Sequence, residues 1–342
     1  MRKLHLQNTF SEDGKKWREL LSRAAIKPDK TLEEVFGIFD GDKLEATAAR
    51  YRNIIKCVAV VEACRGTNLI NELISGMYNE VFAAGYSACY VYTKEDTRKA
   101  FEYFGFREIE HVGGILYFME HAAGGFRNYL NELRGKRVKA GEVGAAIVMN
   151  ANPFTKGHLH LVTQAATEND EVHLFILSED ASAFSTSVRT ALVRRGTAHL
   201  KNIVMHPTSD YLVSAATFPA YFLKEDDDIT EVQARLDARI FKHHIAPALG
   251  VTVRYVGKEP FSNATDIYNM ALEREFAGCP ELRVLDRLCI DGEVVSATRV
   301  RELLAEGKIK EAGKLVPPTT YDYFISADGQ MAIEALRLSQ KQ

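Results

Sequence analysis

A four-residue segment in the middle of the chain carries side chains that can bind a phosphate group. It runs from Thr155 to His158, with the sequence TKGH, between a continuous apolar run at 143–149 and the apolar positions of an expected helix. An imidazole N–H in the first turn of a helix can donate to a phosphate oxygen, helped by the helix dipole. Thr155 would add a hydroxyl donor, Lys156 a positive charge, and Gly157 room for close backbone packing. A core histidine bonded to a backbone carbonyl is the alternative.

A second segment with phosphate-binding chemistry lies near the end of the chain. It runs from Val295 to Arg301, with the sequence VSATRVR. Ser296 or Thr298 can cap the helix that follows, and such a cap is typically worth about 1 kcal/mol. Arg301 lies in the first turns of that helix, and its planar guanidinium can hold two phosphate oxygens. An ordinary capped surface helix is the alternative.

A third candidate is the turn from Arg65 to Asn68, of sequence RGTN. It lies where a β-branched run at 54–61 gives way to a helical apolar stripe at 69–77. The free N–H groups and the helix dipole at such a turn can bind a pyrophosphate. The alternative is a plain strand-to-helix turn in which Arg65 is solvated.

Four continuous apolar runs in the second half of the chain alternate with helical stretches. Such runs are typical of parallel strands that are covered on both faces, and ligands of such sheets bind at the carboxyl ends of the strands. Asn150 and Asn152 follow the first run, and Gly257 follows the last, where a plain turn and an amphipathic helix are the alternative to a ligand site. The apolar runs are 143–149, 172–177, 203–205 and 251–256, and the helices include 187–200 and 230–249.

The first half of the chain predicts a different domain, with antiparallel strands and two helices. Polar turn residues separate its expected strands, which favours a meander. The segment 126–143 is rich in glycine and basic residues, which indicates a linker with a short helix inside. We therefore expect domains at 1–125 and 144–342. The expected strands are 35–39, 43–52, 54–61, 89–92, 106–110 and 115–120, and the helices are 69–77 and one that ends at Gly105.

The composition restricts the class of partner. The 342 residues include 43 Lys and Arg against 46 Asp and Glu, so no basic surplus favours nucleic acid or an anionic membrane. Five cysteines form no CxxC pair, which favours reduced thiols. The N-terminus lacks the apolar stretch of a signal peptide, and no apolar run reaches the roughly 20 residues of a membrane span. We expect a soluble cytoplasmic protein.

Several other polar groups are weaker candidates. Asp210, Tyr211 and Ser214 could line an acetate or metal site, but a loop packed by the tyrosine explains them equally well. The acidic run 225–228 is best explained as the solvated start of a helix. His243-His244 cannot both face one ligand from a helix, and zinc-ligand spacing is absent, so we expect no metal site in the protein.

Residues 1–125 resemble the GNAT acetyltransferase fold. The segments that carry the resemblance are 54–61, RGTNLINELI and above all TKEDTRKAFEYFGF. The resemblance implies that Arg65, Gly66, Thr67 and Asn68 bind a pantetheine or CoA-like group. Gly66 matches the family turn, but Ala63 and Asn68 depart from it, which would suit an arm tethered to protein rather than free CoA.

The second half resembles the HIGH-type nucleotidyltransferases, whose signatures are [H/T]-x-G-H and I-S-S-T-x-x-R. The combination with a GNAT-like half, and segments such as FPAYFLK and VGKEP, are similar to the citrate lyase ligase family over nearly the whole chain. The resemblance implies an acid-thiol ligase with ATP and Mg²⁺: acetate and ATP give acetyl-AMP and pyrophosphate. The acetyl group then moves to a thiol on the acyl carrier subunit of citrate lyase, at the end of a phosphoribosyl-dephospho-CoA arm.

The resemblance also assigns roles. His158 and Thr155 would hold the transferring phosphate, and Arg301 with Lys156 would neutralise the leaving pyrophosphate. Other residues of the nucleotide site would be Asn150, Asn152, Gly157, Gly257, Ser296 and Thr298. Two alternatives stay open: an adenylyltransferase of cofactor biosynthesis, of the pantetheine-phosphate or NMN type, that carries a separate acetyltransferase, and a first domain that only docks an acyl carrier.

Overall fold

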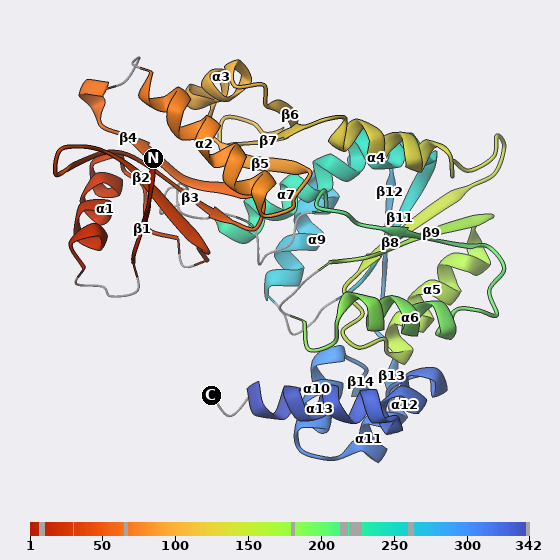
Figure 1. The fold of residues 1–342 in the computed structure, drawn as a ribbon. Helices are drawn as coiled ribbons and strands as arrows, with labels where there is room; N and C mark the ends of the chain where they lie inside the picture. The colour runs from red at the N-terminus through yellow and green to blue at the C-terminus, as the bar shows by residue number, and fades with distance from the viewer. Residues whose placement is uncertain are drawn as a thin grey trace. The chain divides into compact units, whose positions relative to one another are not determined.

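The computed structural model divides the chain into two compact units (Figure 1). One unit contains residues 1–131 and 217–239, and the other contains 132–216 and 240–342. Each compact unit therefore consists of two separate chain segments. The domain boundaries 1–125 and 144–342 remain a prediction. The structure describes residues 1–6, 11–29, 31–64, 68–178, 182–212, 218, 228–258 and 263–339, apart from the side chains of 263–266 and 339.

A seven-stranded, mostly antiparallel sheet forms the first unit, and every strand predicted there is confirmed. The strand order is β1-β2-β3-β4-β5-β7-β6. Strand β1 and the first helix, which Ser11 caps, were not predicted. Three residues of strand show no alternation, and the helix begins with a run of polar residues and glycine. The strands are β1 (Arg2–Leu4), β2 (Glu34–Asp40), β3 (Lys43–Tyr51), β4 (Ile54–Val60), β5 (Ala88–Thr93), β6 (Arg107–Val112) and β7 (Leu116–Ala122).

Strands β4 and β5 form the only parallel pair among the described strands of this sheet, and they separate quickly. They pair at Ile54 with Tyr90 and at Ile55 with Val91. Two residues further along β4, Cys57 has a left-handed backbone (φ 52°), and the β3–β4 register shifts at the same place. A bulge of this kind bends a strand and ends its pairing. The two strands therefore pair at only two residues each.

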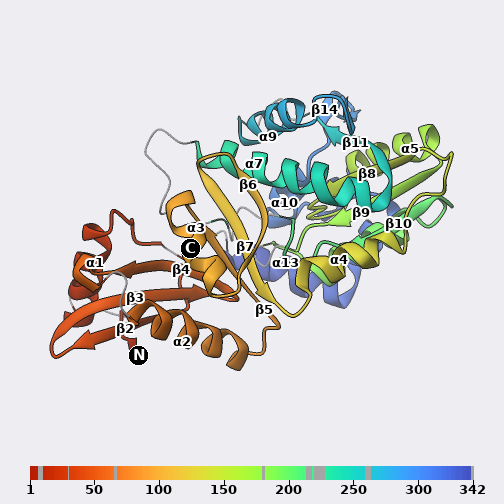
Figure 2. The same ribbon diagram turned by 90° about the horizontal axis from the view of Figure 1, so that it is seen from above.

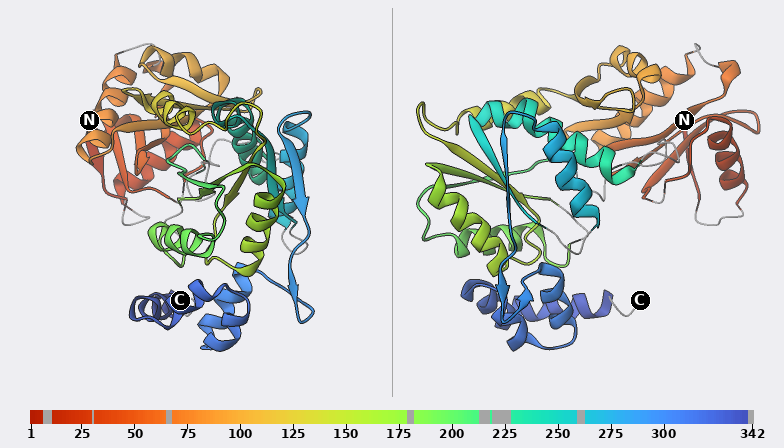
Figure 3. Two further views of the ribbon diagram at one scale, coloured as in Figure 1. Left: turned by 90° about the vertical axis from the view of Figure 1, so that its right-hand side faces the viewer. Right: turned by 180° about the vertical axis from the view of Figure 1, so that it is seen from behind.

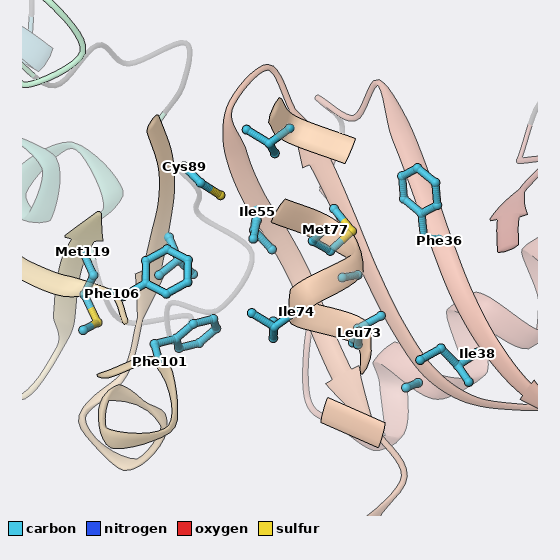
Figure 4. Close-up of a cluster of buried hydrophobic side chains, with 14 of the residues drawn as sticks. Phe36, Ile38, Ile55, Leu73, Ile74, Met77, Cys89, Phe101, Phe106 and Met119 are labelled. Carbon is cyan, nitrogen blue, oxygen red and sulfur yellow. The ribbon is translucent and has the colours of Figure 1, made fainter. Parts of the chain in front are cut away.

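Helix α2 (Leu69–Ala83) covers one face of this sheet. Its residues Leu73, Ile74 and Met77 are fully buried, and Figure 4 shows them over the strands between Phe36 and Ile55. Burying each such side chain contributes about 1.5–3 kcal/mol. Helix α1 (Glu12–Arg23) lies on the other side of β2–β4 (Figure 2), and α3 (Glu95–Tyr103) follows β5.

The second unit contains a five-stranded sheet in which every pair is parallel. Its order is β10-β9-β8-β11-β12, which confirms the predicted Rossmann-like fold class. The edge strand β12 was not predicted, because it is only partly covered and has no continuous apolar run. The strands are β8 (Gly144–Met149), β9 (Glu171–Ile176), β10 (Ile203–Pro207), β11 (Val251–Gly257) and β12 (Glu281–Leu285).

Helices cover both faces of the parallel sheet (Figure 3). Helices α5 (Lys156–Glu168) and α6 (Thr186–Gly196) share one apolar core with alternate residues of the strands. Residues that point to the other face meet different helices; Arg254 of β11, for example, bonds Tyr268 of α9 and stacks over Phe241. The remaining helices of this unit are the π-helix Phe241–Ile245, α8 (Ala246–Leu249) and α9 (Asn263–Glu275). Helices α4 (Gly125–Arg134), at the predicted linker, and α7 (Ile229–Ile240) lie at the unit boundaries, with most of their residues in the first unit.

The C-terminal part of the second unit is a separate helical cluster with its own core. A short hairpin, β13 (Cys289–Ile290) and β14 (Glu293–Val294), turns at Asp291-Gly292, both with positive φ, and leads directly into the cluster. The core includes Val300, Leu303 and Phe324. The helices are α10 (Ala297–Ala305), α11 (Ile309–Lys314), α12 (Pro318–Ile325) and α13 (Ala327–Ser339). None of the described helices has the length and hydropathy to cross a bilayer.

Two histidines on neighbouring strands are buried in the second unit. Nδ1 of His173 lies 2.7 Å from Nε2 of His206, and the His206 ring stacks on Phe175. A carboxylate oxygen of Glu171 lies 3.0 Å from Nε2 of His173. Burial lowers the pKa of His173 to about 4 and that of His206 to about 3, and the positive charge of Lys136 adds to both effects. The pair is therefore neutral near pH 7.

This pair predicts a loss of stability in mild acid. Unfolded histidines titrate near pH 6.5, so between about pH 6.5 and pH 4 the unfolded chain binds more protons than the folded one. The free energy of unfolding should fall as the pH drops through that window, by about 1.4 kcal/mol for each pKa unit of difference. Urea denaturation at pH 7, 6 and 5 measures it, and His206→Gln should flatten the dependence. An unchanged slope in that variant would contradict the assignment.

Candidate active site

The loop after β8 carries the first predicted motif to the carboxyl edge of the parallel sheet. Ala151 has a left-handed backbone (φ 49°), which turns the chain away from the strand. Phe154 is fully buried, and its ring stacks on that of His158 with centroids 5.9 Å apart. Space for Phe154 exists because Gly196 of α6 has no side chain: a methyl group there would lie 2.5 Å from the ring.

Thr155 and His158 bond to each other in a capping box at the start of α5. The Thr155 hydroxyl oxygen accepts from the backbone N–H of His158 (3.3 Å), and Nδ1 of His158 accepts from the backbone N–H of Thr155 (3.1 Å). The two side chains also touch, with 2.9 Å between the hydroxyl oxygen and Nδ1. Thr155 is almost completely buried, so the structure shows it as the residue that begins the helix and orients the imidazole.

The capping box determines which nitrogen of His158 carries the proton. Burial, assisted by the positive charge of Arg287, lowers the pKa of His158 to about 4, so the ring is neutral at pH 7. Because Nδ1 accepts a backbone N–H, the single ring proton belongs on Nε2. The structure does not show the alternative arrangement, in which a core histidine bonds a backbone carbonyl: Nδ1 of His158 accepts a backbone N–H. Instead, the side chain keeps an N–H donor on Nε2.

The second motif meets the first, although 149 residues separate the bonded pair. Nη1 of Arg301 donates to the carbonyl oxygen of Asn152 (2.6 Å), and Nη2 donates to the Thr298 hydroxyl (3.1 Å). Burial lowers the pKa of Arg301, but arginine remains a cation near neutral pH. Ser296 caps α10 by accepting from the N–H of Arg299 (3.1 Å).

The N-terminal ends of α5 and α10 lie next to each other. A methyl group on Gly157 would lie 3.3 Å from the carbonyl oxygen of Val295, the residue before the α10 cap. Gly157 therefore permits a close backbone approach, as predicted, and the segment that approaches it contains Val295. The arrangement places two positive helix ends, a neutral imidazole donor and a guanidinium within one small region, which is suited to a phosphate ligand.

Asn150 and Asn152 hold the loop in place. Arg189 of α6, which is fully buried, donates to the Asn150 side-chain oxygen (2.9 Å) and to the backbone oxygens of Asn150 and Leu177. The Asn152 side chain accepts from the N–H of Phe184 (3.1 Å). Arg189 thus joins the carboxyl ends of β8 and β9. We did not predict it, and the available signal was an arginine on the apolar face of a predicted helix.

Arg287 is a second residue that the sequence analysis missed. It lies two positions after β12, and its guanidinium donates to the backbone oxygens of Lys258 (2.8 Å) and Val295 (3.3 Å). Burial lowers its pKa. Gly257, at the end of β11, has open space where a side chain would be. Lys156 is the first residue of α5, and its N–H donates to the Leu315 carbonyl.

The other predicted residues lie outside this arrangement or outside the described part of the chain. Arg65, Gly66, Thr67, Ser214 and the acidic residues 225–227 belong to the undescribed residues. Asn68 precedes α2 without a side-chain cap bond, and Tyr211 is buried. Asp228 accepts from the N–H groups of Thr230 and Glu231, as expected of a helix start. Within the described ranges, no three His, Cys, Asp or Glu side chains are grouped to hold a metal ion.

Comparison with known proteins found similar proteins over most of the chain. Residues 144–324 match the family model described as the citrate lyase ligase C-terminal domain. The chain is 37% identical over 320 residues to the citrate (pro-3S)-lyase ligase of Escherichia coli K12, covering 91% of both chains. Among solved structures, Escherichia coli ElaA covers 35% of this chain and 97% of its own at 17% identity (TM-score 0.31). Thermotoga maritima TmcAL bound with alpha-thio ATP covers 58% of this chain and 56% of its own at 13% identity (TM-score 0.38).

The capping box predicts the tautomer of His158. In ¹⁵N NMR spectra, the ring should remain neutral with its proton on Nε2 from pH 8 down to about pH 5, since its pKa is near 4. Thr155→Ser should preserve the spectrum, because its hydroxyl can still cap the helix. Thr155→Val should lose about 0.5–2 kcal/mol of stability and disturb the ring nitrogen shifts. A protonated Nδ1 in the wild-type protein would contradict the geometry.

Proposed function

The chain belongs to the citrate lyase ligase family, and we propose that it activates citrate lyase by acetylating the prosthetic-group thiol of that enzyme with acetate and ATP. The observation that carries the proposal is the meeting of the two motifs. Arg301 bonds the loop that leads into α5, and His158 presents a neutral N–H donor in the first turn of that helix. The residues come together at the carboxyl edge of a parallel sheet, where such folds bind nucleotides.

The proposed reaction has two steps. In the first, a carboxylate oxygen of acetate forms a bond to the α-phosphorus of ATP, and the bond from that phosphorus to the bridging oxygen of the leaving pyrophosphate breaks. The products are acetyl-AMP and pyrophosphate. In the second step, the thiol loses its proton and attacks the acetyl carbonyl, which releases AMP and gives the thioester.

The residues of the site act by positioning and by stabilising charge. Negative charge grows on the α-phosphate oxygens and on the leaving pyrophosphate. We assign the Nε2–H of His158 to a non-bridging α-phosphate oxygen, and the guanidinium of Arg301 with the ammonium of Lys156 to the pyrophosphate. Thr155 works through His158 by holding its ring. Asn150 and Asn152 shape the loop beneath the phosphates. Gly157, Gly257, Ser296 and Thr298 are proposed as the other residues of the nucleotide site.

Mg²⁺ is proposed as a companion of ATP. The described side chains of the site are imidazole, guanidinium, amide and hydroxyl groups, which suit a cation carried by the phosphates. Bound in this way, the ion would neutralise part of the triphosphate charge. We also place the reaction in the cytoplasm, where ATP is made and thiols stay reduced; the five cysteines, all of them in the described part of the chain, form no disulfide.

The first unit is proposed to receive the thiol arm of the acyl carrier subunit. Beyond Ile55 and Val91, strands β4 and β5 no longer pair, which leaves strand edges that can bond the amide groups of an extended pantetheine-type arm. The segment from Arg65 to Asn68, which precedes α2 in the chain, is the proposed site for the phosphate end of the arm. A catalytic part in the acetyl transfer is not assigned to this unit.

Replacement of His158 should strongly slow the first step. With His158→Ala, acetate-dependent exchange of labelled pyrophosphate into ATP should fall about 10²- to 10³-fold, because one donor to a developing negative charge is lost. His160→Ala is the matched control, since it lies on the exposed side of the same helix. Wild-type exchange in His158→Ala would refute the role of the imidazole. Exchange that requires pantetheine phosphate or nicotinamide mononucleotide instead of acetate would refute the substrate.

A change in the first unit should separate the two steps. Gly66→Val places a bulky side chain in the turn proposed to bind the arm, so acetyl transfer to the lyase should fall at least about tenfold, while pyrophosphate exchange stays within about twofold of wild type. Gly113→Val, at an open position in the β6–β7 turn, is the control. If Gly66→Val reduced pyrophosphate exchange and acetyl transfer equally, the proposed assignment of the two steps to different units would be wrong.

A further inference from the structure

Arg189 of α6 is a buried cation that the proposed reaction does not use. Its side chain is fully buried, on a helix that packs against the parallel sheet. Burying a cation costs free energy unless its N–H groups find oxygens to bond. An apolar side chain would fill the same space without this cost, so the arginine needs an explanation other than packing.

All three nitrogens of the Arg189 guanidinium donate to oxygens near the carboxyl edge of the sheet. Nη1 donates to the backbone oxygens of Asn150 and Leu177 (2.7 Å each) and to the Asn150 side-chain oxygen (2.9 Å). Nη2 donates to the Thr186 hydroxyl (2.9 Å), and Nε donates to the backbone oxygen of Phe184 (3.0 Å). One side chain therefore joins the segments that follow β8 and β9 to the start of α6.

The bond to Phe184 is the first of three that lead to Arg301. The Phe184 N–H donates to the Asn152 side-chain oxygen (3.1 Å), and the Asn152 backbone oxygen accepts from Nη1 of Arg301 (2.6 Å). The Phe184 ring is buried and stacks on Phe324 of α12, with centroids 6.0 Å apart. Phe184 is thus held at both its backbone and its ring, and it connects Arg189 with the loop that bonds Arg301.

The position of the Arg301 guanidinium depends on this loop. Arg301 has two hydrogen bonds to the described part of the chain, and one of them goes to Thr298 on its own helix. The bond to Asn152 is therefore the one that relates the guanidinium to the segment before α5. A displaced Asn152 carbonyl would displace the guanidinium, and an arginine binds phosphate oxygens in pairs only when its planar fork is correctly placed.

We infer that Arg189 is a positioning residue for ATP binding: through Phe184 and Asn152 it fixes the Arg301 guanidinium where it can hold the pyrophosphate part of the nucleotide. The inference rests on the proposed function, because it takes ATP as the substrate. Arg189 acts from within the protein, since its own guanidinium is fully buried.

A lysine at position 189 tests the inference. Arg189→Lys keeps a cation for the oxygens of Asn150 and Leu177, but it has no Nε–H for Phe184. The affinity of the full-length protein for a non-hydrolysable ATP analogue, measured by calorimetry, should fall about tenfold. The affinity for adenosine, which has no phosphate, should stay within about twofold. Arg194→Lys is the matched control, because Arg194 is an exposed arginine of the same helix.

A double-mutant cycle with Arg301→Met shows whether Arg189 acts through Arg301. If it does, Arg189→Lys should change the affinity for the ATP analogue by less than about twofold once Arg301 is absent. Losses that multiply in the double variant would overturn the inference. So would an unchanged affinity in Arg189→Lys, or equal losses of affinity for the analogue and for adenosine, which a general structural role predicts.

Asn152→Leu covers the case in which Arg189→Lys does not fold. Leucine is close to asparagine in size and lacks the oxygen that accepts the Phe184 N–H, while the backbone oxygen for Arg301 remains. The same selective loss of affinity for the ATP analogue is expected, and it should again nearly disappear in combination with Arg301→Met. Multiplying losses in this second cycle would contradict the inference in the same way.

The affinity measurements separate this inference from the proposed function, because they need no acetate. If the wild-type protein binds the ATP analogue but shows no acetate-dependent pyrophosphate exchange, the proposed function fails, and the cycle still decides the role of Arg189. If exchange is normal and the losses multiply in the double variant, only the inference fails. A wild-type protein that does not bind the analogue would refute both.

Discussion

The geometry of the proposed phosphate site depends on one hydrogen bond, from the backbone N–H of Thr155 to Nδ1 of His158. The bond assigns the ring proton to the opposite nitrogen and fixes the plane of the imidazole. It forms because Thr155 is the N-cap of α5, where its hydroxyl satisfies a free N–H of the first turn. Packing of Phe154 against Gly196 then holds the preceding loop. The same interaction therefore caps the helix and determines the geometry of the site in this part of the chain.

Charge is the second constraint on the site. The folded protein gathers two partly buried arginines and two helix N-termini around one group of backbone oxygens. Burial lowers the pKa of both arginines, because desolvation disfavours a charged group. Positive charge of this kind is suited to the polyanionic nucleotide proposed as substrate.

Much of this organisation could be predicted from the sequence, since the patterns behind it are local. The run at 143–149 predicts β8 because a strand covered on both faces contains no polar positions, and the TKGH segment predicts a phosphate-binding helix start because its residues are adjacent. The contacts of Arg189 and Arg287 could not be predicted in this way. Both side chains bond backbone oxygens from distant segments, and a carbonyl group leaves no trace in the residue type. The edge strand β12 escaped prediction because it is only partly covered and contains no continuous apolar run.

The division of the chain into units has a consequence for its synthesis. Residues 217–239 belong to the first unit, where Arg239 donates to the backbone oxygen of His111 and pairs with Glu110. The chain therefore passes between the units three times, after residues 131, 216 and 239. Domains usually fold one after another as they leave the ribosome. Here the first unit is complete only after a segment that is translated about a hundred residues later. Its assembly therefore overlaps with that of the parallel sheet. If translation stops before residue 217, neither unit is complete.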